Sequence, residues 1–100
     1  MTMTTVGDPS AAATLAREIV DARLAACVQV VGAHSTYRWS GAVEEAAEQL
    51  LFIKTTTARS AELQAFIAER HTYDLPEIIS VEISAGSAGY LGWLDENTRA

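Results

Sequence analysis

The stretch HTYDLPE, residues 71–77, holds the residue types best suited to binding a metal ion. His71 offers an imidazole and Glu77 a carboxylate, with Tyr73 between them. Pro76 favours an extended backbone before it and so fixes the point at which Glu77 leaves the turn. Imidazole and carboxylate together suit copper or zinc, but one of each makes an incomplete site unless other chains contribute. The structural alternative is a histidine that ends a helix, where an imidazolium interacts favourably with the helix dipole.

The single cysteine, Cys27, is a second candidate ligand. It cannot form a disulfide within the chain, and it fits a reducing compartment. If a hairpin turns at residues 40–41 with a two-residue loop, Cys27 lies opposite Lys54. A nearby ammonium would favour the thiolate, which is the form that binds soft metals. The alternative is a small buried side chain, because free cysteines are among the most buried residue types.

Two aromatic residues and one carboxylate in the same hairpin point to a binding surface. Tyr37 and Trp39 share one face of a strand by alternation. The helices of so short a chain cannot cover a slender ribbon, so we expect an interface between subunits or a ligand cleft, with packing inside one chain as the alternative. Glu48 shares a strand face with Phe52 and Lys54, and it is expected to pair with a lysine or to ligate a cation.

The composition is that of one folded domain spanning residues 1–100. Of the 100 residues, 49% are apolar and only 20% are charged, which excludes the usual signature of disorder. The net charge of −6 argues against binding the phosphate backbone of nucleic acids. No apolar run approaches the roughly 18 residues needed to span a bilayer, and residues 1–10 lack the features of a secretory signal. We therefore expect a cytoplasmic protein with no membrane partner.

Two amphipathic helices and a shorter terminal one are predicted. Asp8 is a suitable N-cap and Pro9 a suitable first residue for a helix ending near Leu24. A second helix covers residues 59–71, with Leu63, Phe66, Ile67 and the aliphatic stem of Arg70 on one side. A third begins at Ser87, although its glycines weaken it.

Four strands complete the predicted order. Residues 1–6 form the first, and residues 26–39 form the second with an interruption at Gly32. The third follows the turn at residues 40–41, where the flanking strand signals override the helical preference of EEAAE. The fourth covers residues 76–84, where apolar and polar residues alternate. The order β-α-β-β-α-β with a terminal helix predicts an α+β, ferredoxin-like fold whose second sheet face must be buried elsewhere.

Five spaced motifs resemble those of the CutA divalent-cation tolerance proteins: RLAACV at 23–28, YRWSG at 37–41, LFIKT at 51–55, HTYDLPE at 71–77 and YLGWL at 90–94. The resemblance covers essentially the whole chain. It implies a ferredoxin-like protomer in a tight homotrimer, similar in architecture to PII signalling proteins, with sheets that pair edge to edge between subunits.

The resemblance also implies roles for particular residues. His71 and Cys27 occupy the places that are associated with copper or other divalent ions in this family. The residues that would line the clefts between subunits are Tyr37, Trp39, Glu48, Lys54, His71, Tyr73 and Glu77. One departure is visible, because Thr72 stands where many members have proline, and the turn loses a rigid φ angle there.

Two functions follow as hypotheses. The first is a non-enzymatic homotrimer that responds to divalent ions, Cu(II) among them, with His71, Cys27 and Glu77 as ligands and no obligatory cofactor. The second is a PII-like sensor or adaptor that binds a small anionic metabolite through Lys54 and the aromatic residues. Acylphosphatases share the predicted fold, but their phosphate-binding loop follows the first strand, whereas the similar segment here follows the first helix.

Overall fold

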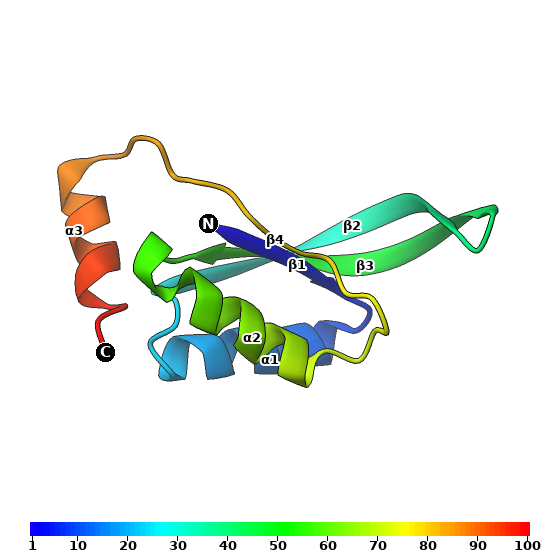
Figure 1. The fold of residues 1–100 in the computed structure, drawn as a ribbon, viewed down its shortest axis with the longest axis horizontal. Coiled ribbons are helices and arrows are strands. Elements are labelled where there is room, and N and C mark those ends of the chain that lie inside the picture. The colour runs from blue at the N-terminus through cyan, green and yellow to red at the C-terminus, as the bar shows by residue number, and fades with distance from the viewer.

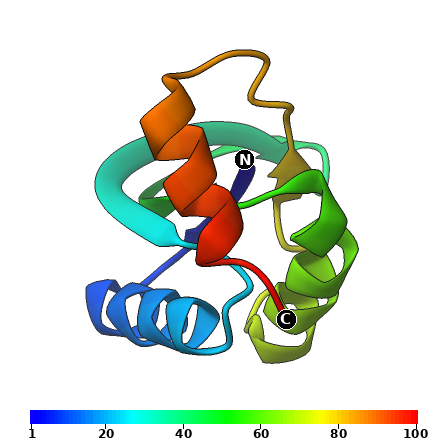
Figure 2. The ribbon, with the colours of Figure 1, turned by 90° about the vertical axis from the view of Figure 1, so that its left-hand side faces the viewer.

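The computed structural model describes all 100 residues as four antiparallel strands, three α-helices and a short 3-10 turn. The strands are β1 (Thr2–Val6), β2 (Cys27–Trp39), β3 (Ala42–Lys54) and β4 (Ile78–Ser80), and they lie in the order β2-β3-β1-β4. Helices α1 (Pro9–Asp21) and α2 (Ser60–Arg70) lie side by side on one face of the sheet, while α3 (Ala88–Glu96) lies at one end (Figures 1 and 2). The predicted α+β, ferredoxin-like fold is confirmed.

Helix α1 begins and ends for identifiable reasons. The Asp8 carboxylate accepts a hydrogen bond from the Ala11 amide at 2.9 Å, and Pro9 occupies the first helical position. At the other end Arg23 adopts a left-handed conformation with φ of 59°, and the Leu24 amide donates to the Ile19 carbonyl. The helix therefore ends at Asp21, slightly before the predicted end near Leu24.

The core lies between the two long helices and the sheet. Leu63 and Ile67 of α2 are fully buried, as are Leu51 and Ile53 of β3. The predicted apolar side of α2 is confirmed, and the Arg70 guanidinium lies 3.5 Å from the centre of the Phe66 ring. These contacts fix which face of the sheet carries the helices.

The β2–β3 hairpin follows the predicted register over its whole length. Its turn residues Ser40 and Gly41 have φ angles of 51° and 81°, and two positive φ angles match the right-handed twist of hairpin strands. Pairing runs from Trp39 opposite Ala42 to Cys27 opposite Lys54. The predicted interruption at Gly32 is wrong, because this residue pairs with Gln49 and the ladder continues through it.

Strand β4 is shorter than the predicted strand of residues 76–84. It pairs with β1 from Ser80, opposite Thr2, to Ile78, opposite Thr4. The Val81 amide still donates to the Met1 carbonyl, but beyond it no strand of the same chain lies alongside. The alternating residues 81–84 therefore remain exposed and outside any sheet.

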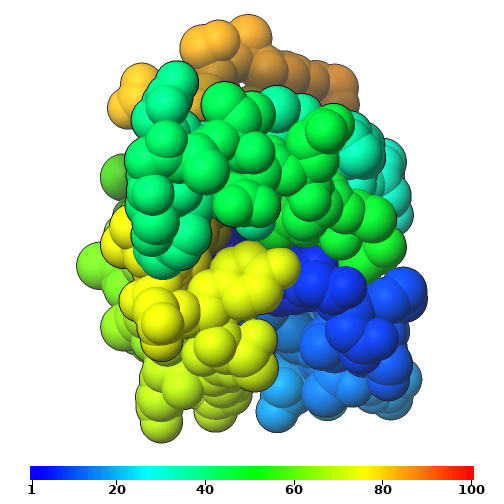
Figure 3. Space-filling model, turned by 90° about the vertical axis from the view of Figure 1, so that its right-hand side faces the viewer, coloured from blue at the N-terminus to red at the C-terminus, as the bar shows by residue number.

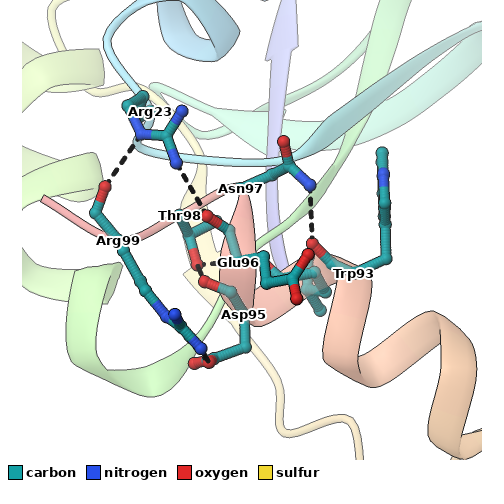
Figure 4. A network of polar contacts seen from close by, with 8 residues as sticks. Arg23, Trp93, Asp95, Glu96, Asn97, Thr98 and Arg99 are labelled. Carbon is teal, nitrogen blue, oxygen red and sulfur yellow. Dashed lines mark hydrogen bonds and ion pairs between the residues drawn. The ribbon is translucent and has the colours of Figure 1, made fainter.

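A polar network holds the end of α3 against the rest of the protein (Figure 4). Arg23 donates through Nε to the Arg99 carbonyl at 2.9 Å and through Nη2 to the Glu96 carbonyl at 2.7 Å. The Thr98 hydroxyl donates to the Leu94 carbonyl at 2.9 Å, and the Leu94 side chain is buried. Cationic donors at the last carbonyls of a helix stabilise its C-terminal end.

The face of the sheet opposite α1 and α2 carries apolar side chains that the chain leaves partly exposed. These residues alternate along the strands with the buried core positions Leu51 and Ile53. Val31 and Ile79 are each 49% exposed, and Phe52 between them is half-buried. We call this surface the open face; its residues are Met3, Val31, Leu50, Phe52 and Ile79.

None of the three helices has the length and the apolar composition that crossing a membrane requires.

Candidate functional site

A cavity lies between the projecting hairpin and the turn that follows α2. Its volume is about 720 Å³. Figure 3 shows the turn (yellow) against the hairpin (green), with the surface hollowed between them. The residues that line the cavity are Thr5, Ser35, Thr36, Tyr37, Trp39, Ala46, Glu48, Thr72, Tyr73, Asp74, Leu75 and Glu77.

A buried hydrogen bond joins the two walls of this cavity. The Tyr73 hydroxyl donates to Glu48 Oε2 at 2.9 Å, and Glu48 is only 8% exposed. Desolvation, followed by the hydrogen bond to Glu48, raises the pKa of Tyr73 to about 12. Gly7 permits this approach, because a Cβ atom at that position would lie 3.1 Å from the Tyr73 hydroxyl oxygen. Glu48 thus pairs with a tyrosine and not with a lysine, and of the two predicted alternatives the ligation of a cation stays a prediction.

His71 ends α2 and is held by hydrogen bonds at both ring nitrogens. Its backbone leaves the helix with φ of −73° and ψ of 143°, and its amide still donates to the Ile67 carbonyl at 2.9 Å. Nδ1 accepts from the Tyr73 amide at 3.1 Å, which assigns the ring proton to Nε2. Nε2 then donates to the Thr5 carbonyl at 2.7 Å. The histidine ties the turn to β1, beside the cavity.

Cys27 and Lys54 lie at the other end of the hairpin ladder from Trp39. Their predicted pairing is confirmed at the level of the backbone register. The Lys54 ammonium donates to Gln29 Oε1 at 2.6 Å. Since Trp39 and Lys54 occupy opposite ends of the 13-residue strands, one chain cannot bring Lys54 together with the aromatic residues of the cavity.

The structure therefore divides the predicted site residues into two groups. Tyr37, Trp39, Glu48, Tyr73 and Glu77 all line the cavity, and His71 adjoins it. Cys27 and Lys54 lie apart from it. Within one chain, no group of three or more histidine, cysteine, aspartate or glutamate residues lies close enough to hold a metal ion.

Comparison with known proteins assigns the family. Residues 1–97 match the family model of the CutA1 divalent ion tolerance protein. The chain belongs to the CutA1 divalent ion tolerance family. The divalent-cation tolerance protein CutA of Thermus thermophilus is 45% identical over 95 residues, which make up 94% of this chain and 92% of that protein. A solved CutA1 structure from the same species superposes with a TM-score of 0.94 at 43% identity and covers 98% of this chain and 96% of that one.

Plant members of the CutA family are longer. The chloroplastic CutA protein of Arabidopsis thaliana is 43% identical over 96 residues, which cover 95% of this chain but 53% of that protein. The shared part is therefore the region that carries the fold and the cavity.

One chain supplies a single oriented nitrogen ligand, His71, and no complete metal site. In metal centres, the ligating imidazole commonly donates its other ring nitrogen to a carbonyl or carboxylate. His71 already makes this bond, through Nε2 to Thr5. Its Nδ1 would have to release the Tyr73 amide to bind an ion, and the remaining ligands would have to come from further subunits.

Two residues that hold the turn beside this cavity carry no signal in the sequence. Thr5 acts through its backbone carbonyl, and Gly7 acts by having no side chain. Asp74 and Leu75 lie in the same turn as the predicted Tyr73 and Glu77, so the motif HTYDLPE could have identified them.

Replacing Tyr73 with phenylalanine tests the buried pair. We expect Tyr73→Phe to lower the free energy of unfolding at neutral pH by about 1–3 kcal/mol, because the buried Glu48 carboxylate loses its donor. The difference from wild type should shrink from pH 10 to about 12, since a raised pKa stabilises the fold below the unfolded value of 10 and this stabilisation is lost as the pH passes the folded value. Urea unfolding at several pH values measures both effects.

Tyr37→Phe is the matched control, because Tyr37 lines the same cavity and is 44% exposed. It should lower the free energy of unfolding at neutral pH by less than Tyr73→Phe does, because no buried carboxylate loses its donor. A Tyr73→Phe curve that runs parallel to wild type above pH 10 would contradict the assignment.

Proposed function

We propose that this protein is a non-enzymatic homotrimer in the cytoplasm that binds divalent cations, with Cu(II) as the first candidate. The observation that carries the metal assignment is His71, whose Nε2 is fixed by Thr5 and whose Nδ1 meets only a backbone amide. Cys27 and Glu77 are the proposed further ligands, and the family name supports a relation to divalent ions.

The open face and the free strand edges support the trimer. The open face presents Val31 and Ile79 about half exposed, and a further subunit would bury them. Strands β2 and β4 are the two edges of the sheet, and residues 82–84 continue beyond β4 without a neighbouring strand of the same chain. Unpaired strand edges are suited to pairing with another chain. Joining unlike edges head to tail closes a ring when the rotation permits it.

A trimer would also supply the ligands that one protomer lacks. No single chain assembles three candidate ligands, and Cys27 and His71 lie at different positions on the protomer. Subunits packed around an axis can bring such residues from different chains to one ion. Thiolate and imidazole ligands favour copper and zinc over magnesium or calcium.

Calorimetric titration with Cu(II) tests the proposal. Wild type, His71→Ala, Cys27→Ser and Glu77→Gln are compared at the same protomer concentration. We expect saturable binding in wild type and a loss of about tenfold or more in affinity for His71→Ala, since even outer groups that orient a ligand are worth 10–100-fold. His34→Ala is the matched control, because His34 is exposed on the hairpin and pairs only with Glu45 at 2.9 Å.

The outcomes separate the ligands. Loss of binding in His71→Ala but not in His34→Ala supports the site, provided that both variants retain the wild-type melting temperature. Equal affinity in wild type and all three ligand variants would overturn it and leave His71 as the residue that ties the turn to β1.

A PII-like adaptor that binds a small molecule in clefts between subunits is the second candidate. The cavity of about 720 Å³ favours it, because cavities of this size commonly hold small ligands. Metal-independent binding of a small molecule at Tyr37, Trp39 or Tyr73 would support it.

A further inference from the structure

The residue that follows the end of α1 has an unusual backbone conformation. Arg23 has a φ angle of 59°, in the left-handed region that a residue with a Cβ atom adopts only at a cost in free energy. Its amide donates to the Val20 carbonyl at 3.0 Å, and the next amide, that of Leu24, donates to the Ile19 carbonyl at 3.1 Å. These two bonds form a Schellman motif, in which glycine is the usual left-handed residue. Because arginine keeps the strain there, a compensating role of its side chain is expected.

The Arg23 side chain joins the end of α1 to the end of α3 (Figure 4). Nε donates to the Arg99 carbonyl at 2.9 Å, and Nη2 donates to the Glu96 carbonyl at 2.7 Å. The guanidinium is planar, and its donors are fixed relative to one another. Two bonds from one such group therefore set the orientation of the end of α3 as well as its distance from α1.

The charges at the end of α3 make this cation favourable. The last turn of the helix contains Asp95 and Glu96 and no basic residue. Carboxylates are unfavourable at the C-terminal end of a helix, where the carbonyl groups carry partial negative charge. Arg99 Nη2 bonds to Asp95 Oδ2 at 2.9 Å and so engages one of the two carboxylates. Arg23 brings a second positive charge, from a different element, to the last carbonyl groups.

Both ends of the Arg23 bridge are fixed by further contacts within the chain. Next to Arg23, the Leu24 carbonyl accepts a buried hydrogen bond from the Thr55 hydroxyl at 2.6 Å. At the other end, Thr98 is 2% exposed and its hydroxyl donates to the carbonyl of the buried Leu94. None of these residues belongs to the open face or to the sheet edges of the proposed trimer, so the contacts do not depend on that assembly.

We propose that Arg23 is a clamp that holds the C-terminal arm, residues 88–99, on the end of α1. When the clamp opens, α3 is released as a unit while the sheet and the two long helices stay folded. Proteins commonly open in such local units at a lower free energy than that of global unfolding. This conformational device goes beyond the proposed metal function and depends neither on a bound ion nor on a ligand in the cavity.

Hydrogen exchange followed by mass spectrometry tests the clamp. Wild type, Arg23→Ala and Arg23→Gly are compared at the same protomer concentration in the presence of EDTA. We expect the amides of residues 94–98 to exchange at least about fivefold faster in both variants, because the end of α3 loses two hydrogen bonds from a charged donor. The amides of α2 should keep their wild-type rates.

The two variants differ in backbone strain and therefore separate the side chain from the backbone. Glycine removes the left-handed strain at position 23, whereas alanine keeps it, and neither can form the clamp. Arg23→Gly should therefore melt about 4 °C or more above Arg23→Ala, with equally fast exchange in α3. Arg23→Lys should exchange at an intermediate rate, since one ammonium group is a point charge without the fixed fork of a guanidinium.

Ser40→Gly is the matched control for relief of strain. Ser40 also has a positive φ angle, of 51°, but it lies in the hairpin turn. This variant should leave the exchange of residues 94–98 at the wild-type rate.

Each outcome decides the proposal. Faster exchange that is confined to the end of α3 in both Arg23→Ala and Arg23→Gly supports the clamp. Wild-type rates in Arg23→Ala would overturn it. An equal acceleration in α2 would also overturn it, because the substitution would then lower global stability and not release the arm. Wild-type exchange in Arg23→Gly alone would assign the effect to backbone strain and reject the clamp.

Discussion

Val31→Asp is expected to reduce the mass of the protein in solution from three times the protomer mass to the 10.7 kDa of one chain. Val31 lies on the open face and is 49% exposed in a single chain, so an aspartate there is hydrated in the protomer. In the proposed trimer the same side chain would be covered. Burial of an unpaired charge costs on the order of several kcal/mol, and the symmetry of the assembly repeats that cost three times.

Val20→Asp provides the matched control for this experiment. Val20 is 40% exposed and lies on α1, which covers the opposite face of the sheet. The chemical change is identical, and the exposure in one chain is similar. Sedimentation equilibrium or light scattering then measures the mass of both variants and of wild type.

Two results would contradict the trimer. A wild-type mass equal to that of one chain would rule out the proposed trimer. A Val31→Asp variant that keeps the full wild-type mass would show that the interface lies elsewhere. Either result would also remove the proposed source of the extra metal ligands.

Leu63→Ala is expected to lower the free energy of unfolding by about 2–5 kcal/mol, which is typical of removing a buried leucine side chain. Leu63 lies in the first turn of α2 and is fully buried, in the same cluster as Leu51 and Ile53. Shortening it removes apolar contacts and leaves a void that the surrounding helices and sheet can only partly fill. Chemical unfolding followed by circular dichroism measures the change.

Leu75→Ala is the matched control, because Leu75 is 73% exposed in the turn. Exposed substitutions of this kind usually change stability by less than about 0.5 kcal/mol. Because an oligomer is stabilised by its own concentration, both variants should also be measured in the Val31→Asp background. If Leu63→Ala and Leu75→Ala lower the free energy of unfolding by similar amounts, Leu63 does not belong to the core.

Local signals in the sequence predict most of the fold. The turn at Ser40 and Gly41 fixes the register of the whole hairpin, because an unbulged two-residue loop leaves only one pairing. Asp8 and Pro9 place the start of α1 in the same way. The error at Gly32 arises because a long ladder of paired neighbours holds a glycine extended despite its weak preference for strands.

Strand β4 could not be delimited from its own residues. The alternation in residues 76–84 is real, but a strand exists only where a neighbour pairs with it. Within one chain, β1 provides that neighbour only over Ile78–Ser80. The length of a strand is thus a property of the sheet in which it lies.

The sequence also predicts part of the candidate site. The residue types of Tyr37, Trp39 and Tyr73 predict a binding surface, and the structure brings these three residues to one cavity. The contacts that define their chemistry could not be read from the sequence. The carbonyl of Thr5 that holds His71 is backbone and lies 66 positions away, and the donor to Glu48 comes from a different element.

The central place of β1 in the sheet has a consequence for biosynthesis. β1 is synthesised before the other strands of its sheet, yet it lies between β3 and β4, and its pairing with β4 joins residues 78 positions apart. The β2–β3 hairpin can form early because its contacts are local, whereas the edge of β1 that binds β4 stays unpaired until residue 80 has emerged. In a nascent chain this exposed edge is the segment most open to capture by chaperones or to pairing with a neighbouring chain.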